Sequence, residues 1–447
     1  MPSPGEHSVE HHAEEQPMMG VWMTTGLVVG SMIGSGIFML PVSLAPLGLN
    51  MVVAWIVSIL GALSVAFALS RLARLGGNGM QSYIEQAFGP VAGFLVSWAF
   101  WFSNWVGVAA VAIAFGSATT RLVPSFGADA VTMLAVGSIV VLAAINAMGV
   151  RMSGGFNLVT VAIRLVPLVG VALLLALQVA GGGALQPLAA SPITLGNIAT
   201  ATTLTLFAML GFENATAPVG KVRNPERTLP IAILGGTALV GLVYLVSSSG
   251  VALLLPAATL ANSPAPYADV FAAHGGSLMV LLAAFCIAVA AFGSNNCLVL
   301  VTGELGYAMA ERGQLPAVMA RTTAIGTPVI SQIVGSALAI VAVLANTSRT
   351  SAGLFVFLIL LSTSGILVIY LAGTLAAWRE DRSPIARIVM ALAMLFIAFA
   401  FYGAGMEANL WCLVLLAAGG ANYVVMRGFS RQRTSRAAEP VPAALPE

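Results

Sequence analysis

The chain has 447 residues, of which 59% are hydrophobic and only 8% are charged, whereas a soluble domain carries about 25% charged residues. With a mean hydropathy of +0.97, this composition excludes a soluble globular protein and indicates a membrane protein with many spans. The net charge of +2 contains no basic block, so no nucleic-acid partner is expected. All three cysteines lie in apolar segments, which favours neither a disulfide framework nor a metal centre. No cofactor is expected.

Twelve apolar segments are long enough to cross a bilayer, which takes about 20 residues per helix. We therefore predict an all-α integral membrane protein with twelve transmembrane helices in one domain, residues 21–427. Residues 1–20 contain no Lys or Arg and so lack the n-region of a signal peptide. They are expected to form a disordered cytoplasmic tail, and residues 428–447 a second cytoplasmic tail. The predicted spans are 21–45, 51–74, 91–118, 130–149, 156–180, 198–220, 230–255, 277–309, 327–347, 352–378, 385–405 and 408–427.

The basic residues orient these spans. All but three of the 18 Lys and Arg residues lie in loops on one side of the predicted bundle or in the C-terminal tail on that side. Arg121 and Arg349 lie on the other side, and Arg164 lies within the fifth span. Because cytoplasmic loops hold the Lys and Arg excess, we expect both termini to lie in the cytoplasm and the chain to lie in the cytoplasmic (inner) membrane.

Two predicted spans are interrupted near their middle. The first contains "VVGSMIGSGIFMLP", Val28 to Pro41, with three glycines and two serines, and the sixth contains "LFAMLGFENATAPVG", residues 206–220. The sixth also carries a glutamate, Glu213, inside the membrane. Helices interrupted at corresponding places in two successive five-helix blocks are typical of transporters built from inverted repeats.

Such breaks have a chemical use. Irregular backbone is tolerated in a membrane only where it is buried in protein or lines a watery cavity. Unwinding frees N–H groups on one half-helix and C=O groups on the other, and these dipole ends can hold a carboxylate and an ammonium. The breaks therefore predict a site for a zwitterion. The alternative for Gly30 and Gly34 alone is close helix packing.

These segments resemble the amino acid–polyamine–organocation (APC) superfamily, and within it most closely the basic amino acid/polyamine antiporters, including arginine/agmatine exchangers. The resemblance implies inverted repeats of five helices each, about residues 21–180 and 198–378, followed by two helices at about 385–427. It also places the substrate between spans one, three, six, eight and ten, and implies that a homodimer is common. The matching segments are "GSMIGSGIFMLP", "GALSVAFALSRLARLGGNGMQSYIEQAFGP", "LFAMLGFENATAPVGKVRNPERTLPIAILGGT" and "GELGYAMAERGQLPAVMARTTAIGTPV".

The resemblance implies backbone contacts for the substrate. Its carboxylate would meet the N–H groups of Ser35 and Gly36. Its α-ammonium would meet carbonyls near Met32 and Ile33, and others between Phe207 and Leu210 in the sixth span. Phe207 occupies the aromatic position that closes over the substrate as a gate. The arginine/agmatine antiporters have tryptophan there, and phenylalanine is a weaker cation–π partner.

The side chains expected around the substrate differ more from that pattern. The asparagine of the third span is replaced by Val108, although Asn104 one turn earlier can face the same cavity. The tryptophan of the eighth span is replaced by Leu298. Ser362 and Tyr370 in the tenth span correspond to a lining residue and a gate residue. The resemblance therefore leaves both cationic and neutral substrates open.

Glu213 matches an acid that members of the group use in proton-linked gating. A carboxyl group buried at low dielectric is favoured in its neutral form, so it can take up and release a proton. The alternative is a glutamate whose hydrogen bonds only hold two helices together.

Arg164 is the one basic residue expected inside a span. Many sodium-independent relatives have a lysine in this region, whose ammonium takes the place of a sodium ion. Arg164 would replace that ion and brace Gly34 and Ser35 against the region of Ser294, as a fixed charge because arginine does not deprotonate. The alternatives are snorkelling to the surface, although Arg164 lies deep in its span, and pairing with Glu213.

The sequence therefore predicts secondary active, sodium-independent transport of amino acids by alternating access, most simply by an antiporter of the basic amino acid/polyamine type. Its partners would be a small-molecule substrate, an amino acid or a derived amine, and the lipid bilayer. The alternative is a proton-coupled permease or exporter of neutral amino acids. An ion channel is disfavoured because no pore-lining motif repeats, and an enzyme because the predicted spans hold neither histidine nor an acid pair.

Overall fold

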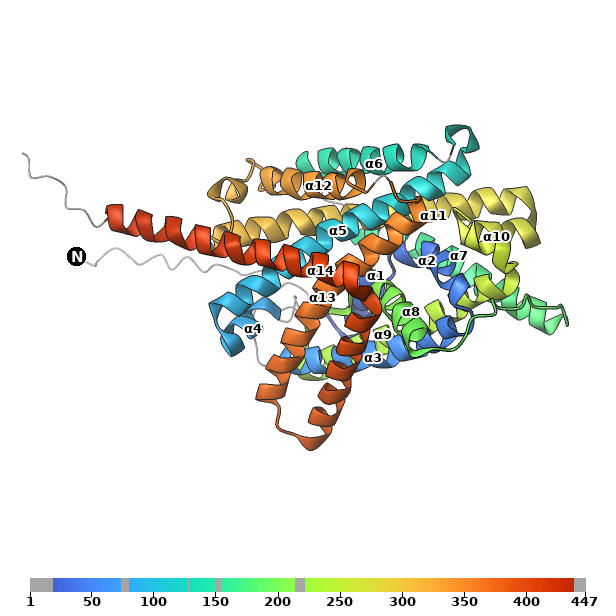
Figure 1. Cartoon of the computed structure of the whole chain (residues 1–447), viewed down its shortest axis with the longest axis horizontal. Coiled ribbons are helices and arrows are strands. Elements are labelled where there is room, and N and C mark those ends of the chain that lie inside the picture. Colours follow the sequence, from blue (N-terminus) through green and yellow to red (C-terminus); the bar gives the residue numbers. More distant parts are fainter. Residues whose placement is uncertain are drawn as a thin grey trace, which may run out of the picture.

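The computed structural model describes residues 19–73, 80–127, 129–149, 154–213, 222–346 and 348–437, and almost all of them are helical (Figure 1). These residues form no β-sheet and contain one isolated bridge, between Met19 and Val222. The predicted N-terminal tail lies almost entirely outside them.

Each of the twelve predicted spans overlaps one of the helices. In chain order, the α-helices of the described residues are α1 (Val21–Met32), α2 (Gly36–Leu44), α3 (Asn50–Ala73), α4 (Met80–Phe88), α5 (Pro90–Leu122), α6 (Ala130–Ala147), α7 (Gly154–Ala180), α8 (Leu195–Met209), α9 (Pro225–Leu254), α10 (Ala257–Ala261), α11 (Pro266–Glu311), α12 (Val329–Leu344), α13 (Ser351–Glu380) and α14 (Pro384–Ala437). Helices α4 and α10 lie between predicted spans.

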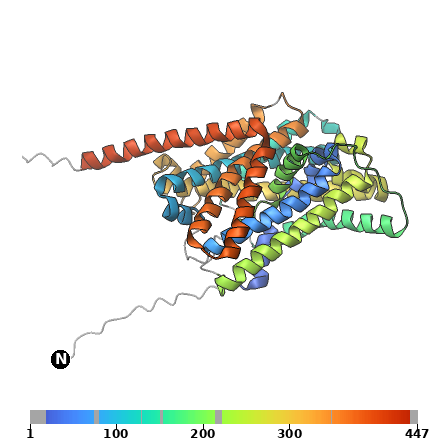
Figure 2. The ribbon, with the colours of Figure 1, turned by 60° about the horizontal axis from the view of Figure 1, so that its bottom comes forward.

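Within the described part of the chain, eight helices are long and apolar enough to cross a membrane, and the bent pair α1–α2 would make a ninth. Helices α8 and α12 are apolar but shorter. Helix α14 has non-helical backbone at Gly405, at the predicted boundary between the last two spans, and turns there (Figure 1). It then continues to Ala437, so residues 428–437 of the predicted C-terminal tail are helical. Figure 2 shows this last segment leaving the bundle.

Local sequence signals fix several helix starts. Pro90 and Pro225 are the first residues of α5 and α9, where the missing proline N–H costs no hydrogen bond. The Thr194 side chain caps α8 by accepting a hydrogen bond from Asn197 N at 3.1 Å. Thr350 caps α13 in the same way through Gly353 N at 3.2 Å.

Helix α5 lies at the centre of the molecule. It packs against α11 and α13, while α3 packs against α8 and α9, and α1 against α9. Most of α5 is buried, whereas α6 and α7 are largely exposed. The exposed side chains of α7 include Val166, Val169, Leu173 and Leu177, which form an apolar face suited to lipid. The side chains that can enclose a solute belong to α1, α2, α5, α8, α11 and α13, together with the buried side of α7 that carries Arg164.

A polar contact ties α3 to the segment between α13 and α14. Arg71 forms an ion pair with Asp381 at 2.5 Å. Ser383 N donates a hydrogen bond to the Asp381 carboxylate at 2.9 Å. The hydrogen bond from the Ser383 backbone, followed by the contact with Arg71, lowers the pKa of Asp381 below its ordinary value.

This pKa direction predicts how stability depends on pH. A carboxyl whose pKa is lowered by folding stabilises the protein above its unfolded pKa and loses that contribution as the pH falls through the folded pKa. D381N should lower the free energy of unfolding at pH 7 by about 0.5 kcal/mol, because the ion pair is partly exposed. The difference from the wild type should shrink below about pH 4. Thermal unfolding of the purified protein across pH measures this, with E380Q at the exposed neighbouring acid as control. A difference that stays constant across pH would contradict the assignment.

Candidate functional site

The first helix is broken between Met32 and Gly36, and the axes of the two halves differ by 52°. Within the break, Gly34 N donates a hydrogen bond to Met32 O at 2.7 Å. The first N–H groups of α2 have no acceptor within their own helix. Because Ser35 at the start of α2 is buried, these N–H groups and the positive end of the helix dipole lie inside the protein.

In the predicted sixth span, α8 ends at Met209, and we call the non-helical residues after it the second break. Leu210 has extended backbone, and Gly211 has φ +118, a conformation that suits glycine alone. A Cβ atom on Gly211 would lie 2.6 Å from the carbonyl oxygen of Ser31. The absence of a side chain at Gly211 therefore lets the two breaks touch. The rest of this segment, residues 214–221, lies outside the described residues.

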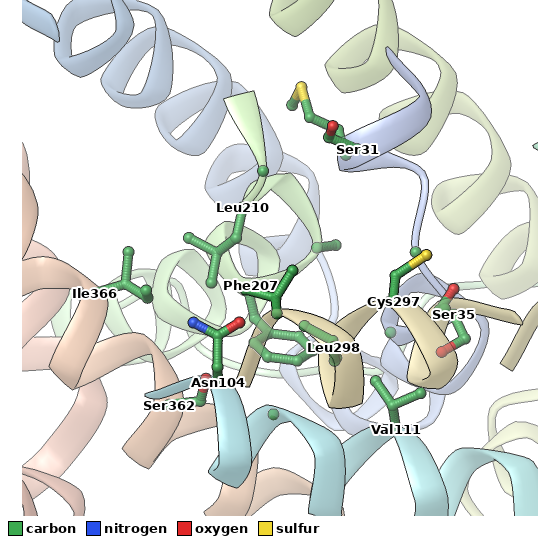
Figure 3. Close-up of a pocket in the computed structure, with 18 of the residues that line it drawn as sticks. Ser31, Ser35, Asn104, Val111, Phe207, Leu210, Cys297, Leu298, Ser362 and Ile366 are labelled. Atoms are coloured by element: carbon green, nitrogen blue, oxygen red, sulfur yellow. The ribbon is translucent and has the colours of Figure 1, made fainter. Parts of the chain in front are cut away.

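A cavity of about 460 Å³ lies where the two breaks meet, which is a usual size for a small-molecule site. Figure 3 shows Asn104 and Ser362 on one side of Phe207, and Ser35 with Cys297 on the other. The cavity is lined by Gly30, Ser31, Met32, Gly34, Ser35, Gly36, Ile37, Phe100, Ser103, Asn104, Gly107, Val111, Arg164, Phe207, Ala208, Leu210, Gly211, Glu213, Ser294, Cys297, Leu298, Val301, Ser362 and Ile366.

Most of the residues predicted from sequence are brought together here. Two of them, Ile33 and Tyr370, do not line the cavity but hydrogen-bond to residues that do. Val108 does not line it either, whereas Asn104, one turn earlier, does. The predicted residues that line it are Met32, Ser35, Gly36, Asn104, Arg164, Phe207, Leu210, Glu213, Leu298 and Ser362.

Phe207 packs directly against the start of α2. A Cβ atom on Gly36 would lie 2.7 Å from Cε1 of the Phe207 ring. The neighbouring lining residues Leu210, Leu298 and Ile366 are also apolar (Figure 3). The ring therefore lies against Gly36 at the start of α2, and its position depends on a glycine at residue 36.

Arg164 lies at the first break. It is 3% exposed, and its Nη1 donates a hydrogen bond to Ile33 O at 2.8 Å. Its Nε and Nη2 make no hydrogen bond among the described residues, and within that part of the chain it forms no ion pair. The thiol of Cys297 lies beside it. Arg164 therefore does not snorkel to the surface, and it is not paired with Glu213.

Glu213 lies at the second break and is held by two elements. Its Oε2 accepts hydrogen bonds from Gly211 N at 3.0 Å and from the Tyr370 hydroxyl at 2.8 Å. The Tyr370 ring in turn stacks on Phe212 with centroids 5.3 Å apart. A change in the protonation of Glu213 would therefore act directly on the contact between the end of α8 and α13.

The carbonyls of the first break already have partners. Met32 O accepts hydrogen bonds from the Tyr244 hydroxyl at 3.0 Å and from Gly34 N, and Ile33 O accepts one from Arg164. Of the last carbonyls of α8, which have no donors within that helix, Phe207 O accepts a hydrogen bond from Leu210 N at 3.3 Å. Among the described residues, the carbonyls of Ala208 and Met209 are therefore better placed than those of Met32 and Ile33 to receive an ammonium group.

Sequence reasoning missed several lining residues, including Cys297, Val111 and Phe100. The signal that would have found them is helical spacing around the residues that were predicted. On α11, Ser294, Cys297 and Val301 lie on the same face as Leu298, and on α5, Phe100 and Val111 share the face of Asn104.

Comparison with known proteins agrees with this architecture. The family model described as amino acid permease matches residues 19–427. The chain belongs to the amino acid permease family. Its relatives are transporters, so the chain is a membrane transporter and not an enzyme.

Curated relatives match at moderate identity. The putrescine transporter PotE of Escherichia coli K12 is 27% identical over 432 residues, covering 91% of this chain and 95% of the relative. PotE of Haemophilus influenzae is 27% identical over 425 residues, covering 91% and 96%. The cadaverine/lysine antiporter of Escherichia coli K12 is 29% identical over 314 residues, covering 69% and 70%.

The contact between Gly36 and Phe207 predicts a loss of transport in G36A. The added methyl group would displace the ring by about 1 Å, and a misplacement of that size lowers rates by roughly 10- to 100-fold. The measurement is initial uptake in proteoliposomes, normalised to reconstituted protein. G26A is the matched control, because a Cβ atom on Gly26 in α1 meets no atom within 4 Å. If G36A transported as well as G26A, the proposed close contact would be wrong.

The position of Cys297 in the cavity predicts that thiol reagents inhibit transport. It is exposed and lines the cavity, whereas Cys286 is half-buried and Cys412 is buried. A methanethiosulfonate reagent should inhibit transport in the wild type, in C286S and in C412S, but not in C297S, with each compared with its own untreated rate. A transported solute should protect Cys297 from labelling. Equal inhibition of C297S would show that the reagent acts elsewhere.

Proposed function

We propose that this chain exchanges amino acids across the cytoplasmic membrane by alternating access and without sodium. The observation that carries this proposal is the meeting of the broken first helix and the end of α8 at one cavity. N–H groups at the start of α2, and the carbonyls of Ala208 and Met209 at the end of α8, have no partner within their own helices and offer opposite partial charges. A zwitterionic amino acid, with a carboxylate and an ammonium, matches this pair of ends.

The proposed architecture has twelve spans with both termini in the cytoplasm. Spans are supplied by the eight long helices, the bent pair α1–α2, the shorter helices α8 and α12, and the second half of α14 beyond Gly405. The two inverted repeats would be about residues 21–180 and 198–378, each beginning with a broken helix. The distribution of Lys and Arg supports the orientation.

We base the proposed independence of transport from sodium on the position of Arg164. A guanidinium is a permanent cation, and this one is buried against Ile33 O at the break of the first helix. A sodium ion in the same place would compete with that charge. The protein thus carries its own cation where a sodium-coupled relative would need to bind one.

The side chain of the amino acid is proposed to be neutral. The cavity wall near Phe207 is apolar, and Glu213 is the one carboxyl group among its described lining residues. Its hydrogen bonds to Gly211 and Tyr370 already occupy it. A cationic amino acid is the second candidate, favoured by the curated relatives named for putrescine and for cadaverine and lysine.

Glu213 is proposed to link exchange to protons. Its carboxyl group lies at the end of α8 and accepts a hydrogen bond from Tyr370 on α13. Protonation would remove one acceptor lone pair and the negative charge, which weakens this contact. Exchange by the wild type should therefore differ between pH 5 and pH 7.5, and E213Q should remove most of that difference.

Counterflow in sodium-free proteoliposomes tests the proposal. The vesicles are loaded in turn with leucine, methionine, alanine, lysine, arginine or agmatine, and uptake of each labelled solute is followed. We expect exchange of leucine, methionine or alanine. Exchange confined to lysine and arginine would support the second candidate, and transport that appears only with added sodium would contradict the role given to Arg164.

A further inference from the structure

We propose that Arg164 binds the carboxylate of the transported amino acid directly. The site would then select amino acids over the amines that remain when the carboxylate is removed. This inference rests on the proposed function, because it specifies the substrate class of the same cavity. It concerns a side-chain contact, in addition to the backbone N–H groups at the start of α2.

The free edge of the guanidinium carries the argument. Nη1 is used by Ile33 O at 2.8 Å, while Nε and Nη2 have no hydrogen-bond partner among the described residues. Nε and Nη2 share one edge of the planar group, and that edge binds a carboxylate through two parallel N–H···O bonds. Arg164 lines the cavity and is buried. A bidentate edge without a partner among the described residues therefore belongs to a side chain of the cavity wall.

Neighbouring hydroxyl groups also lack acceptors. The Oγ atoms of Ser35 and Ser294 are buried, line the same cavity and make no hydrogen bond within the described part of the chain. Ser35 is also the residue before α2, whose first N–H groups are free. Buried donors are costly when they remain unpaired. One anionic group with several lone pairs would satisfy these donors together.

A role as a sodium substitute alone does not account for the free edge. Sodium is held by oxygen atoms, and a guanidinium that only replaced it would direct its N–H groups at several of them. Here one carbonyl oxygen is bonded. The other near neighbours are the thiol of Cys297, which is a weak acceptor, and the hydroxyl of Tyr244, whose proton goes to Met32 O. Two donor positions therefore remain available to a ligand.

The charge of the cavity also favours a ligand with a carboxylate. Arg164 is permanently positive, and Glu213 is the one carboxyl group among the described lining residues. The cavity is thus neutral or positive, whatever the protonation of Glu213. A diamine would bring two positive charges close to the guanidinium with no carboxylate to offset it. An amino acid supplies a carboxylate as the ion-pair partner of Arg164.

Paired ligands test this in the wild-type protein. Each pair keeps the side chain and removes the carboxylate: leucine with isoamylamine, and lysine with cadaverine. Leucinamide keeps the shape but removes the negative charge. We measure inhibition of exchange in proteoliposomes and, independently of transport, the thermal stabilisation of the purified protein by each ligand. The amines and the amide should be at least about 100-fold weaker than the best amino acid, because the donors would stay unpaired.

Two variants separate binding from a structural role. R164K keeps the charge but cannot form two parallel bonds, and R164Q loses the charge as well. Both should weaken binding of the amino acid by roughly 10- to 100-fold. R164Q should also narrow the ratio of the affinity for the amino acid to the affinity for the matching amine. A merely structural role would weaken all ligands alike and leave that ratio unchanged. If neither variant folds, the wild-type ligand series decides alone.

The possible failures are distinguishable. If isoamylamine or cadaverine is exchanged and stabilises as well as its amino acid, this inference is wrong while amino-acid transport stands. If no amino acid is exchanged or stabilises the protein, the proposed function is wrong and this inference with it. A ratio that R164Q leaves unchanged would also overturn the inference.

Discussion

The site depends on backbone that leaves the helical path inside a membrane. Bilayer hydrocarbon supplies no hydrogen bonds, so free N–H and C=O groups persist there only when protein or a polar cavity surrounds them. The two breaks meet this constraint by facing each other: Gly211 lies against the carbonyl of Ser31. Helices α5, α11 and α13 complete the cavity wall. The cavity thus exists because two helices each give up hydrogen bonds at the same place.

Arg164 places a permanent positive charge in the wall of that cavity. Burying a guanidinium costs free energy unless its charge and its N–H groups have partners. The hydrogen bond from Nη1 to Ile33 O leaves Nε and Nη2 without a partner among the described residues. The same residue therefore underlies both the proposed independence from sodium and the proposed carboxylate ligand. The acidic group of the cavity, Glu213, lies at the second break and accepts a hydrogen bond from Tyr370. The two ionisable groups mark the two broken helices.

Much of this was predictable from sequence, because the signals are local. Glycines at Gly34 and Gly36, and an acid at Glu213, mark the breaks, and apolar length marks the helices. What could not be predicted is set by packing between distant helices. Nothing near Met32 in the sequence indicates that Tyr244 already occupies its carbonyl. Likewise, the helical course of residues 428–437 follows from continuation of α14 and not from an apolar pattern.

The most direct test of the account is a structure of the protein determined with an amino acid bound. The account predicts the solute in the cavity between the two breaks, with its carboxylate near Ser35, Gly36 and the free edge of Arg164, its ammonium at the end of α8, and its side chain under Phe207. An amino acid bound elsewhere in the protein, or bound here with its carboxylate turned away from Arg164, would contradict it.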